Sequence, residues 1–386
     1  MMTSKYNLNI PFYLIAAVAC SFVFSLFLLQ VFAAIVGLLW LFEKNKEKKK
    51  AFDLLTISVL AFGITRLITA FFSEFPKASS EIYLKEALFY LFFFSANFYL
   101  KLFSPEKRSD MIRFFLVAAV AASLTGIISF NLNFVERAQS FSSGYTVFSS
   151  YLLAVLPLLI FFPIDNNIKK NQYLRISGII IIAVGIITSL GRTSVAIAAL
   201  FFIVGIALKK FRFIDILAVS FAVALFSILS FHNNSLELQG RIGNPVGFSD
   251  RDVLYKGAKE ILFTHPVLGY GPHTFKNIFP LFNEVNDKGI GGWHNEFLQI
   301  YFDSGVLGLL SFLFLIVVVY YLGIRLLKNR VNRDIVIGLL LSVTSFIISA
   351  FTSGFITSPV LSVLFVFIIT MLNSYNSRVR DIKQTL

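Results

Sequence analysis

The chain has 386 residues, of which 57% are hydrophobic and 14% charged, and 46 of them are Phe. Soluble domains average about 45–50% apolar and about 25% charged residues. This composition therefore excludes a soluble α/β enzyme, a disordered chain and a collagen-like fibre. It predicts an all-α polytopic membrane protein.

The net charge of +13 comes from 34 Lys and Arg against 21 Asp and Glu. Most positive charges lie in short connections between apolar runs, where they indicate topology and not nucleic-acid binding. The one cysteine, Cys20, lies within an apolar run, so we expect neither an internal disulfide nor a cysteine-based metal site. We expect no cleavable signal peptide, because the first apolar run is too long for one.

A helix that crosses a bilayer needs about 20 apolar residues. The candidate runs are 12–42, 52–72, 83–103, 112–131, 147–163, 173–190, 194–208, 213–231, 305–326, 335–352 and 356–373. We interpret the first run as two short helices that break around Ser25–Gln30, which gives about twelve spans. A single span over this run would change only the side of the N-terminus.

The basic connections, among them EKNKEKKK at 43–50, fall on one side of the membrane if the spans alternate. Short positive loops stay cytoplasmic. We therefore expect both termini in the cytoplasm and one long loop on the outer, periplasmic face between spans nine and ten. The expected organisation is spans one to nine in 1–231, the outer catalytic loop in 232–294, and the last three spans with a basic tail in 295–386.

Within the outer loop, residues 249–262 show the pattern of an amphipathic helix with Ser249 as N-cap and Asp252 at the third position. Arg251 falls in the first turn, where a guanidinium beside free backbone N–H groups would bind phosphate. Alternatively, Asp250 and Asp252 simply neutralise Arg251 at a solvated helix start.

The histidines of the outer loop differ in the role that their sequence context indicates. His265 and His273 in HPVLGYGPHTF show no zinc-binding spacing, so we expect ordinary loop histidines and no metal site. A second helix is expected to begin near His294–Asn295 and to break at Ser304–Gly305. The dipole at its N-terminus favours the neutral imidazole that a general base needs, whereas a nearby diphosphate would act in the opposite sense. Alternatively, His294 only hydrogen-bonds locally.

Four ionisable residues lie within or beside the spans, namely Arg66, Lys85, Glu86 and Arg192. Charges at membrane depth are costly and indicate function. The structural alternatives are an Arg66–Glu86 ion pair and an Arg192 side chain that reaches the interface.

With Arg251 and His294, the cations Arg66, Lys85 and Arg192 predict a cationic cleft at the level of the lipid headgroups. Such a cleft suits the diphosphate of a lipid carrier, because the Arg fork binds phosphate oxygens in pairs.

Four stretches carry a family resemblance: SLGRTSVA at 189–196, SDRDVLYKGAKEI at 249–261, HPVLGYGPHTF at 265–275 and WHNEFLQIYFDSGVLGLL at 293–310. With the span count and the place of the long loop, they resemble the O-antigen ligase / O-antigen polymerase superfamily. The resemblance implies a glycosyltransferase of the bacterial inner membrane that needs neither metal nor cofactor and uses a glycan on undecaprenyl diphosphate as donor.

The motif match implies that Arg192 and Arg251 hold the diphosphate and that His294 activates the acceptor hydroxyl. Arg66, Lys85 and Glu86 match no motif and are possible support for the cleft. An O-antigen ligase, with lipid A-core as acceptor, is the favoured function, and an O-antigen or capsule repeat-unit polymerase, with a carrier-linked glycan as acceptor, is the alternative. A lipid-linked glycan transporter is less favoured, because the sequence shows no paired halves.

Overall fold

The computed structural model describes residues 8–22, 24–163, 169–233, 251–288, 290–330 and 332–376. Within these ranges the chain forms helices and no strands, so the all-α prediction is confirmed for them. Helices suit this apolar sequence, because lipid offers no hydrogen-bond partner to a backbone N–H or C=O group.

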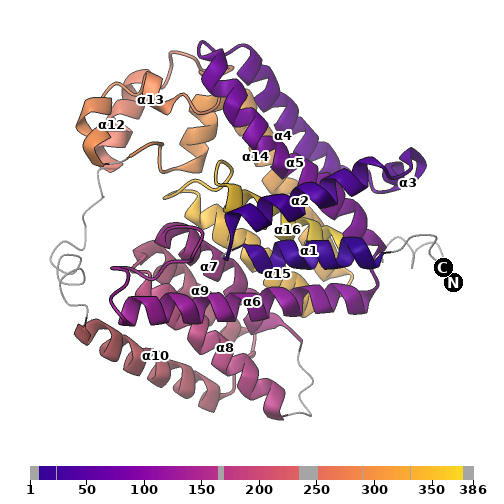
Figure 1. Cartoon of the computed structure of the whole chain (residues 1–386), viewed down its shortest axis with the longest axis vertical. Coiled ribbons are helices and arrows are strands. Elements are labelled where there is room, and N and C mark those ends of the chain that lie inside the picture. Colours follow the sequence, from indigo (N-terminus) through magenta and orange to yellow (C-terminus); the bar gives the residue numbers. More distant parts are fainter. Residues whose placement is uncertain are drawn as a thin grey trace.

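Figure 1 shows the arrangement of the helices. Their bounds are α1 Asn9–Ser21, α2 Leu26–Leu41, α3 Asn45–Lys50, α4 Leu54–Phe71, α5 Pro76–Leu102, α6 Pro105–Asn131, α7 Tyr145–Phe161, α8 Lys169–Thr188, α9 Arg192–Ala207, α10 Phe213–Asn233, α12 Arg251–Ile261, α13 Phe275–Ile278, α14 Glu296–Lys328, α15 Arg333–Ser349 and α16 Pro359–Ser374, with two short 3-10 turns at Phe282–Glu284 and Asn286–Lys288.

The first apolar run forms two helices, as expected, but the break lies earlier than predicted. α1 ends at Ser21 and α2 begins at Leu26, so Gln30 lies inside α2. The Ser25 side chain accepts a hydrogen bond from the Leu28 backbone N–H at 3.2 Å. The break therefore occurs where a serine can cap the next helix, because such a cap satisfies a backbone donor that has no partner in the helix.

Two further helices begin before their apolar runs do. α5 begins at Pro76 and α6 at Pro105, whereas the hydropathy pattern predicts starts at 83 and 112. Proline is favourable in the first turn, because its missing N–H would have no partner in the helix there. Hydropathy marks only the apolar part of a helix, and the hydrogen-bond ladder continues into the polar turns.

Five helical segments are long and apolar enough to cross a membrane by length and composition: α4, α6, α14, residues 171–188 of α8 and residues 213–230 of α10. Shorter apolar helices include α1, α2, α7, α9 and α16. These helices support a membrane protein, and the count of about twelve spans stays a prediction.

The centre of the bundle is formed by α7 and α16, whose side chains are buried along almost their whole length. α15 packs along α7, α16 along α5, and α14 along α4. A helix that is apolar on all sides is stable only when other helices or lipid surround it. By contrast, α10 exposes Phe221, Ile228 and other large apolar side chains, as expected for a lipid-facing helix.

A small folded unit, here the outer segment, consists of the described residues between 251 and 302. α12 and α13 lie together near α4, α5 and α14, apart from α8 (Figure 1). The outer segment has its own hydrophobic cluster, which centres on Trp293. The Trp293 ring stacks on Phe302 with ring centroids 4.1 Å apart and meets Phe279 edge to face at 5.5 Å. This separate core gives the outer segment a fixed shape.

The outer segment joins the bundle at a break in α14. Gly305 has a left-handed backbone (φ 62°), which confirms the expected break at Ser304–Gly305. The 266–271 loop pairs with the broken turn, since Val306 N–H donates to Pro266 O at 2.8 Å and Tyr270 N–H donates to Phe302 O at 2.8 Å. The backbone groups that the break releases are therefore satisfied.

Gly305→Ala is expected to destabilise the protein by about 1–3 kcal/mol, because a Cβ atom would strain the left-handed backbone and would lie 2.1 Å from Val267 O. Thermal unfolding of the purified protein in detergent measures the effect. Gly144→Ala is the matched control, since Gly144 has φ −66° and no atom within 4 Å of the added Cβ. Equal melting temperatures for the two variants would contradict the prediction.

Candidate active site

One cavity brings three of the predicted site residues together. Its volume is about 660 Å³, and Arg192, Arg251 and His294 all line it. They come from the beginning of α9, the beginning of α12 and the turn before α14. The cationic cleft expected from the sequence therefore has a physical counterpart around these three residues.

The N-terminal ends of four helices lie at this cavity. Tyr145, Arg192 and Arg251 are the first residues of α7, α9 and α12, Asn295 is the N-cap of α14, and all four line the cavity. A helix N-terminus carries a partial positive charge and backbone N–H groups without intrahelical partners. Their convergence favours an anionic ligand.

The cavity lining is positively charged. Arg137 and Lys288 join Arg192 and Arg251, and no Asp or Glu is among the described residues that line the cavity. The Arg137 guanidinium lies on the Tyr145 ring, with Cζ 3.1 Å from the ring centroid, and its Nε donates to Ser189 O at 3.0 Å. The sequence pattern did not single out Arg137 or Lys288, because no local motif marks either residue.

Arg192 is held by a tight turn at 188–191. Leu190 has a left-handed backbone (φ 56°), and the Ala138 N–H donates to Thr188 O at 3.0 Å. One turn into α9, the Ser194 hydroxyl donates to Ser149 Oγ of α7 at 3.1 Å. These contacts fix the start of α9 against α7, so the Arg192 backbone has a defined place at the cavity.

Arg251 contacts the loop between α15 and α16, where its Nη2 donates to Thr352 O at 2.9 Å. The same loop is held from α14 by the buried Glu296, whose Oε2 accepts hydrogen bonds from the backbone N–H groups of Phe355 and Ile356. This loop supplies Thr352, Ser353 and other polar residues to the cavity wall. α12 and α14 therefore fix one wall of the cavity together.

His294 is held between two anchored neighbours. Trp293 is buried in the core of the outer segment, and the Asn295 side chain accepts a hydrogen bond from Leu298 N–H at 3.1 Å. His294 itself has a left-handed backbone (φ 48°), which costs roughly 1–2 kcal/mol in an L-residue. Strain of this kind is often found where a side chain must point in a functional direction.

The His294 ring is exposed to the cavity, yet its pKa is lowered from the ordinary value of 6.5. The larger cause is the cavity wall, which removes solvent from the imidazolium form, and the second is the positive charge of Arg251. Lowering the pKa keeps the ring neutral at pH 7, which is the form that accepts a proton. The sequence left the direction of this pKa shift open, and in the structure desolvation is the main cause of the lowering.

Residues 177–313 match the family model described as O-antigen ligase. The resemblance to the O-antigen ligase / O-antigen polymerase superfamily is thereby confirmed. No curated protein matches the chain. The region that matches the ligase family contains Arg192, Arg251 and His294, whereas Arg137 comes from outside it.

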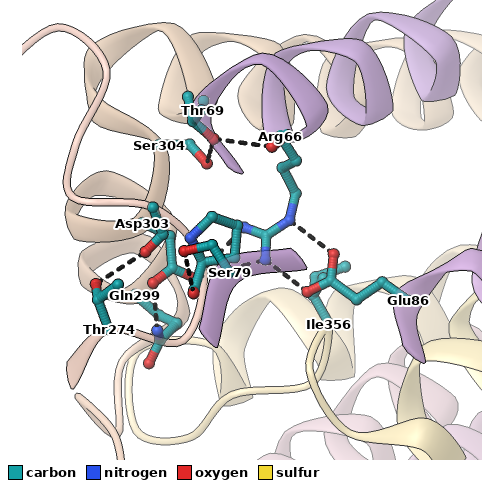
Figure 2. A network of polar contacts seen from close by, with 12 residues as sticks. Arg66, Thr69, Ser79, Glu86, Thr274, Gln299, Asp303, Ser304 and Ile356 are labelled. Carbon is teal, nitrogen blue, oxygen red and sulfur yellow. Dashed lines mark hydrogen bonds and ion pairs between the residues drawn. The ribbon is translucent and has the colours of Figure 1, made fainter. Parts of the chain in front are cut away.

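Two of the other predicted residues form a buried network away from the cavity lining. Arg66, which is 1% exposed, donates from Nε to Glu86 Oε2 at 2.8 Å and from Nη2 to Glu86 Oε1 at 2.5 Å (Figure 2). Its Nη1 also donates to Asp303 Oδ2 at 3.4 Å. The Arg66–Glu86 ion pair is therefore present, and the side chain of Lys85 lies outside the described part of the structure.

Gln299 connects this buried network to the cavity, whose wall it lines. Its Nε2 donates to Asp303 Oδ1 at 2.8 Å, and its Oε1 accepts from the Trp293 N–H at 3.4 Å. Trp293 directly precedes His294. The chain of contacts from Arg66 therefore ends one residue from the candidate base.

Arg66→Gln is expected to destabilise the protein by about 3–5 kcal/mol, because it leaves two buried carboxylates without their cation. Thermal unfolding in detergent measures the loss. Arg113→Gln is the control, since its partner Asp110 lies at 3.0 Å but the two side chains are 63% and 45% exposed. An exposed pair of this kind contributes about 0.2–1 kcal/mol. Similar losses in the two variants would refute the structural role of Arg66.

Arg251→Gln is expected to raise the pKa of His294, because it removes a positive charge that disfavours the imidazolium form. Diethyl pyrocarbonate modifies neutral imidazole, so its rate at the His294 peptide, followed by mass spectrometry, gives the titration midpoint. The midpoint should move to higher pH in Arg251→Gln and stay in place in Arg113→Gln. A fixed or lower midpoint would show that the two residues do not interact.

Proposed function

We propose that this protein is a membrane glycosyltransferase that moves a glycan from undecaprenyl diphosphate to a sugar hydroxyl, as an O-antigen ligase with lipid A-core as acceptor. The observation that carries the proposal is the cavity in which His294 meets four cationic side chains and four helix N-termini. The family match supports an enzyme of the O-antigen ligase or polymerase type.

The donor diphosphate would bind among the cations of the cavity. Arg192 and Arg251 offer guanidinium forks that match phosphate oxygens, and Arg137 and Lys288 add positive charge. When the bond between the anomeric carbon and the diphosphate oxygen breaks, its electron pair stays on the leaving diphosphate. Fixed positive charge stabilises that developing negative charge. In this proposal the cations supply the positive charge that a divalent metal ion supplies in other enzymes.

The acceptor would bind against the hydroxyl-rich wall. The hydroxyl side chains that line the cavity are Tyr145, Thr146, Ser149, Ser150, Thr193, Ser194, Ser349, Thr352, Ser353 and Thr357. Neutral His294 would take the proton of the acceptor hydroxyl as its oxygen attacks the anomeric carbon from the face opposite the diphosphate, with inversion. Because the leaving group is already good, positioning and charge supply most of the acceleration.

The proposed orientation places the cavity on the periplasmic face of the inner membrane and both termini in the cytoplasm. It rests on the charge pattern, because Lys209, Lys210 and Arg212 follow α9 directly at the end opposite Arg192. From the proposed catalytic loop, 232–294, the described residues that line the cavity are Arg251, Lys288, Ile290, Gly292, Trp293 and His294. Ser249, the proposed N-cap, lies outside the described residues.

His294→Ala is expected to lower glycan transfer by about 10²–10⁴-fold, because the acceptor hydroxyl loses its base. Transfer is measured with purified enzyme and carrier-linked donor. His265→Ala is the control, since this ring packs against Tyr270 with centroids 4.3 Å apart and is not among the described residues that line the cavity. Near-normal transfer by a correctly inserted His294→Ala protein would eliminate the base assignment.

Deletion of the gene in its native host tests the proposed function and separates it from the polymerase alternative. Free lipid A-core together with polymer on the lipid carrier would support the ligase. Lipid A-core capped by a single repeat unit would support the repeat-unit polymerase, which uses the same donor site but a carrier-linked acceptor. An unchanged surface glycan would contradict both and would favour glycoprotein modification or transport.

A further inference from the structure

A second charged pocket, here the basal pocket, lies at the other end of α9 from the active-site cavity. Its volume is about 410 Å³, and its lining includes Gln172, Arg175, Lys209, Lys210, Arg212 and Asp334. α9 has 16 residues, so at about 1.5 Å per residue the two sites lie roughly 24 Å apart along this helix. The basal pocket is therefore separate from the proposed glycosyltransferase site.

The described residues of the basal pocket carry more positive than negative charge. Among its four cations, Lys210 contacts Asp334 at 2.6 Å and Arg212 contacts Asp215 at 3.0 Å. The two carboxylates thus pair with Lys210 and Arg212, and Arg175 and Lys209 supply the excess charge. An anion within the pocket would therefore be attracted.

Arg175 in the basal pocket has one hydrogen-bond donor without an acceptor among the described residues. Its Nη2 donates to Lys210 O at 3.0 Å, but its Nε is buried and has no hydrogen-bond partner among the described residues. A buried donor without an acceptor is destabilising, so an anionic ligand that accepts from this N–H would be favoured.

An apolar groove lies next to the basal pocket and shares one lining residue with it. The groove has a volume of about 310 Å³ and lies between α8, α9 and α10, with Ile186, Ala199, Phe202 and Val219 among its lining residues. Phe211 lines both the groove and the basal pocket. A cationic pocket beside an apolar groove matches a molecule with an anionic head and a hydrocarbon chain.

We propose that the basal pocket and the groove bind one anionic phospholipid. Its phosphate contacts Arg175 and Lys209, and one acyl chain lies in the groove beside Phe211. Basic pockets between membrane helices are suited to anionic lipid headgroups. A free phosphate ion would occupy only the basal pocket and would leave the groove empty, so the groove favours the lipid as the source of the phosphate group.

The test uses the purified full-length protein in phosphatidylcholine nanodiscs with increasing amounts of phosphatidylglycerol, and native mass spectrometry measures the bound lipid. The wild-type protein is expected to retain one phosphatidylglycerol. The double variant Arg175→Gln/Lys209→Gln should bind it roughly thirty-fold more weakly, because each cation near the headgroup contributes about fivefold. Lys209→Gln alone should weaken binding in the same direction and changes only an exposed side chain.

Two further variants separate the lipid site from general surface charge and from a simple phosphate site. Lys46→Gln/Lys49→Gln removes the same charge from exposed positions on α3, far from α8 and α10, and should leave retention unchanged (Figure 1). Ala199→Trp fills the groove and should weaken phosphatidylglycerol binding without changing the basal pocket.

Three results would overturn the proposal. The first is equal weakening by the α3 variant, and the second is equal retention of phosphatidylcholine by the wild type. The third is unchanged phosphatidylglycerol retention in Ala199→Trp together with full competition by inorganic phosphate, which would reduce the site to an anion pocket. None of these results depends on glycan transfer, so they leave the proposed enzyme function untouched.

Discussion

Backbone hydrogen bonding at the break in α14 determines where the candidate site lies. The helix that begins beside His294 and the helix that continues into the membrane are one element, bent at Gly305. The 266–271 loop satisfies the backbone groups released there, and Ser304 and Thr69 share a hydrogen bond at 3.0 Å just before the bend. Because lipid offers no hydrogen-bond partner, the bend is stable only with this loop in place.

Charge is divided between a buried ion-pair network and a cavity lined by cations. Arg66 pairs with Glu86 and Asp303, so the buried network holds α4, α5 and α14 together. No Asp or Glu is among the described residues that line the cavity. The first arrangement favours a fixed scaffold, and the second favours an anionic ligand that arrives from outside.

Local patterns along the chain were sufficient for much of the fold and part of the site. Hydropathy located the helices α4 to α10 and α14 to α16 to within several residues. A long apolar run in lipid forms a helix, because only the helix satisfies its backbone N–H and C=O groups within the segment. Glycine and a preceding polar turn located the break in α14. The starts of α5 and α6 were placed too late, since capping and proline, and not hydropathy, decide where a helix begins.

The sequence by itself determined the helical class, the family resemblance and the three residues that carry its motifs, Arg192, Arg251 and His294. Only the tertiary structure brought Arg137 and Lys288 to the same cavity and placed Asp303 on Arg66, 237 positions away in the chain. The reason is physical: helix formation and capping depend on near neighbours in sequence, whereas a shared cavity or a buried ion pair depends on how distant helices pack.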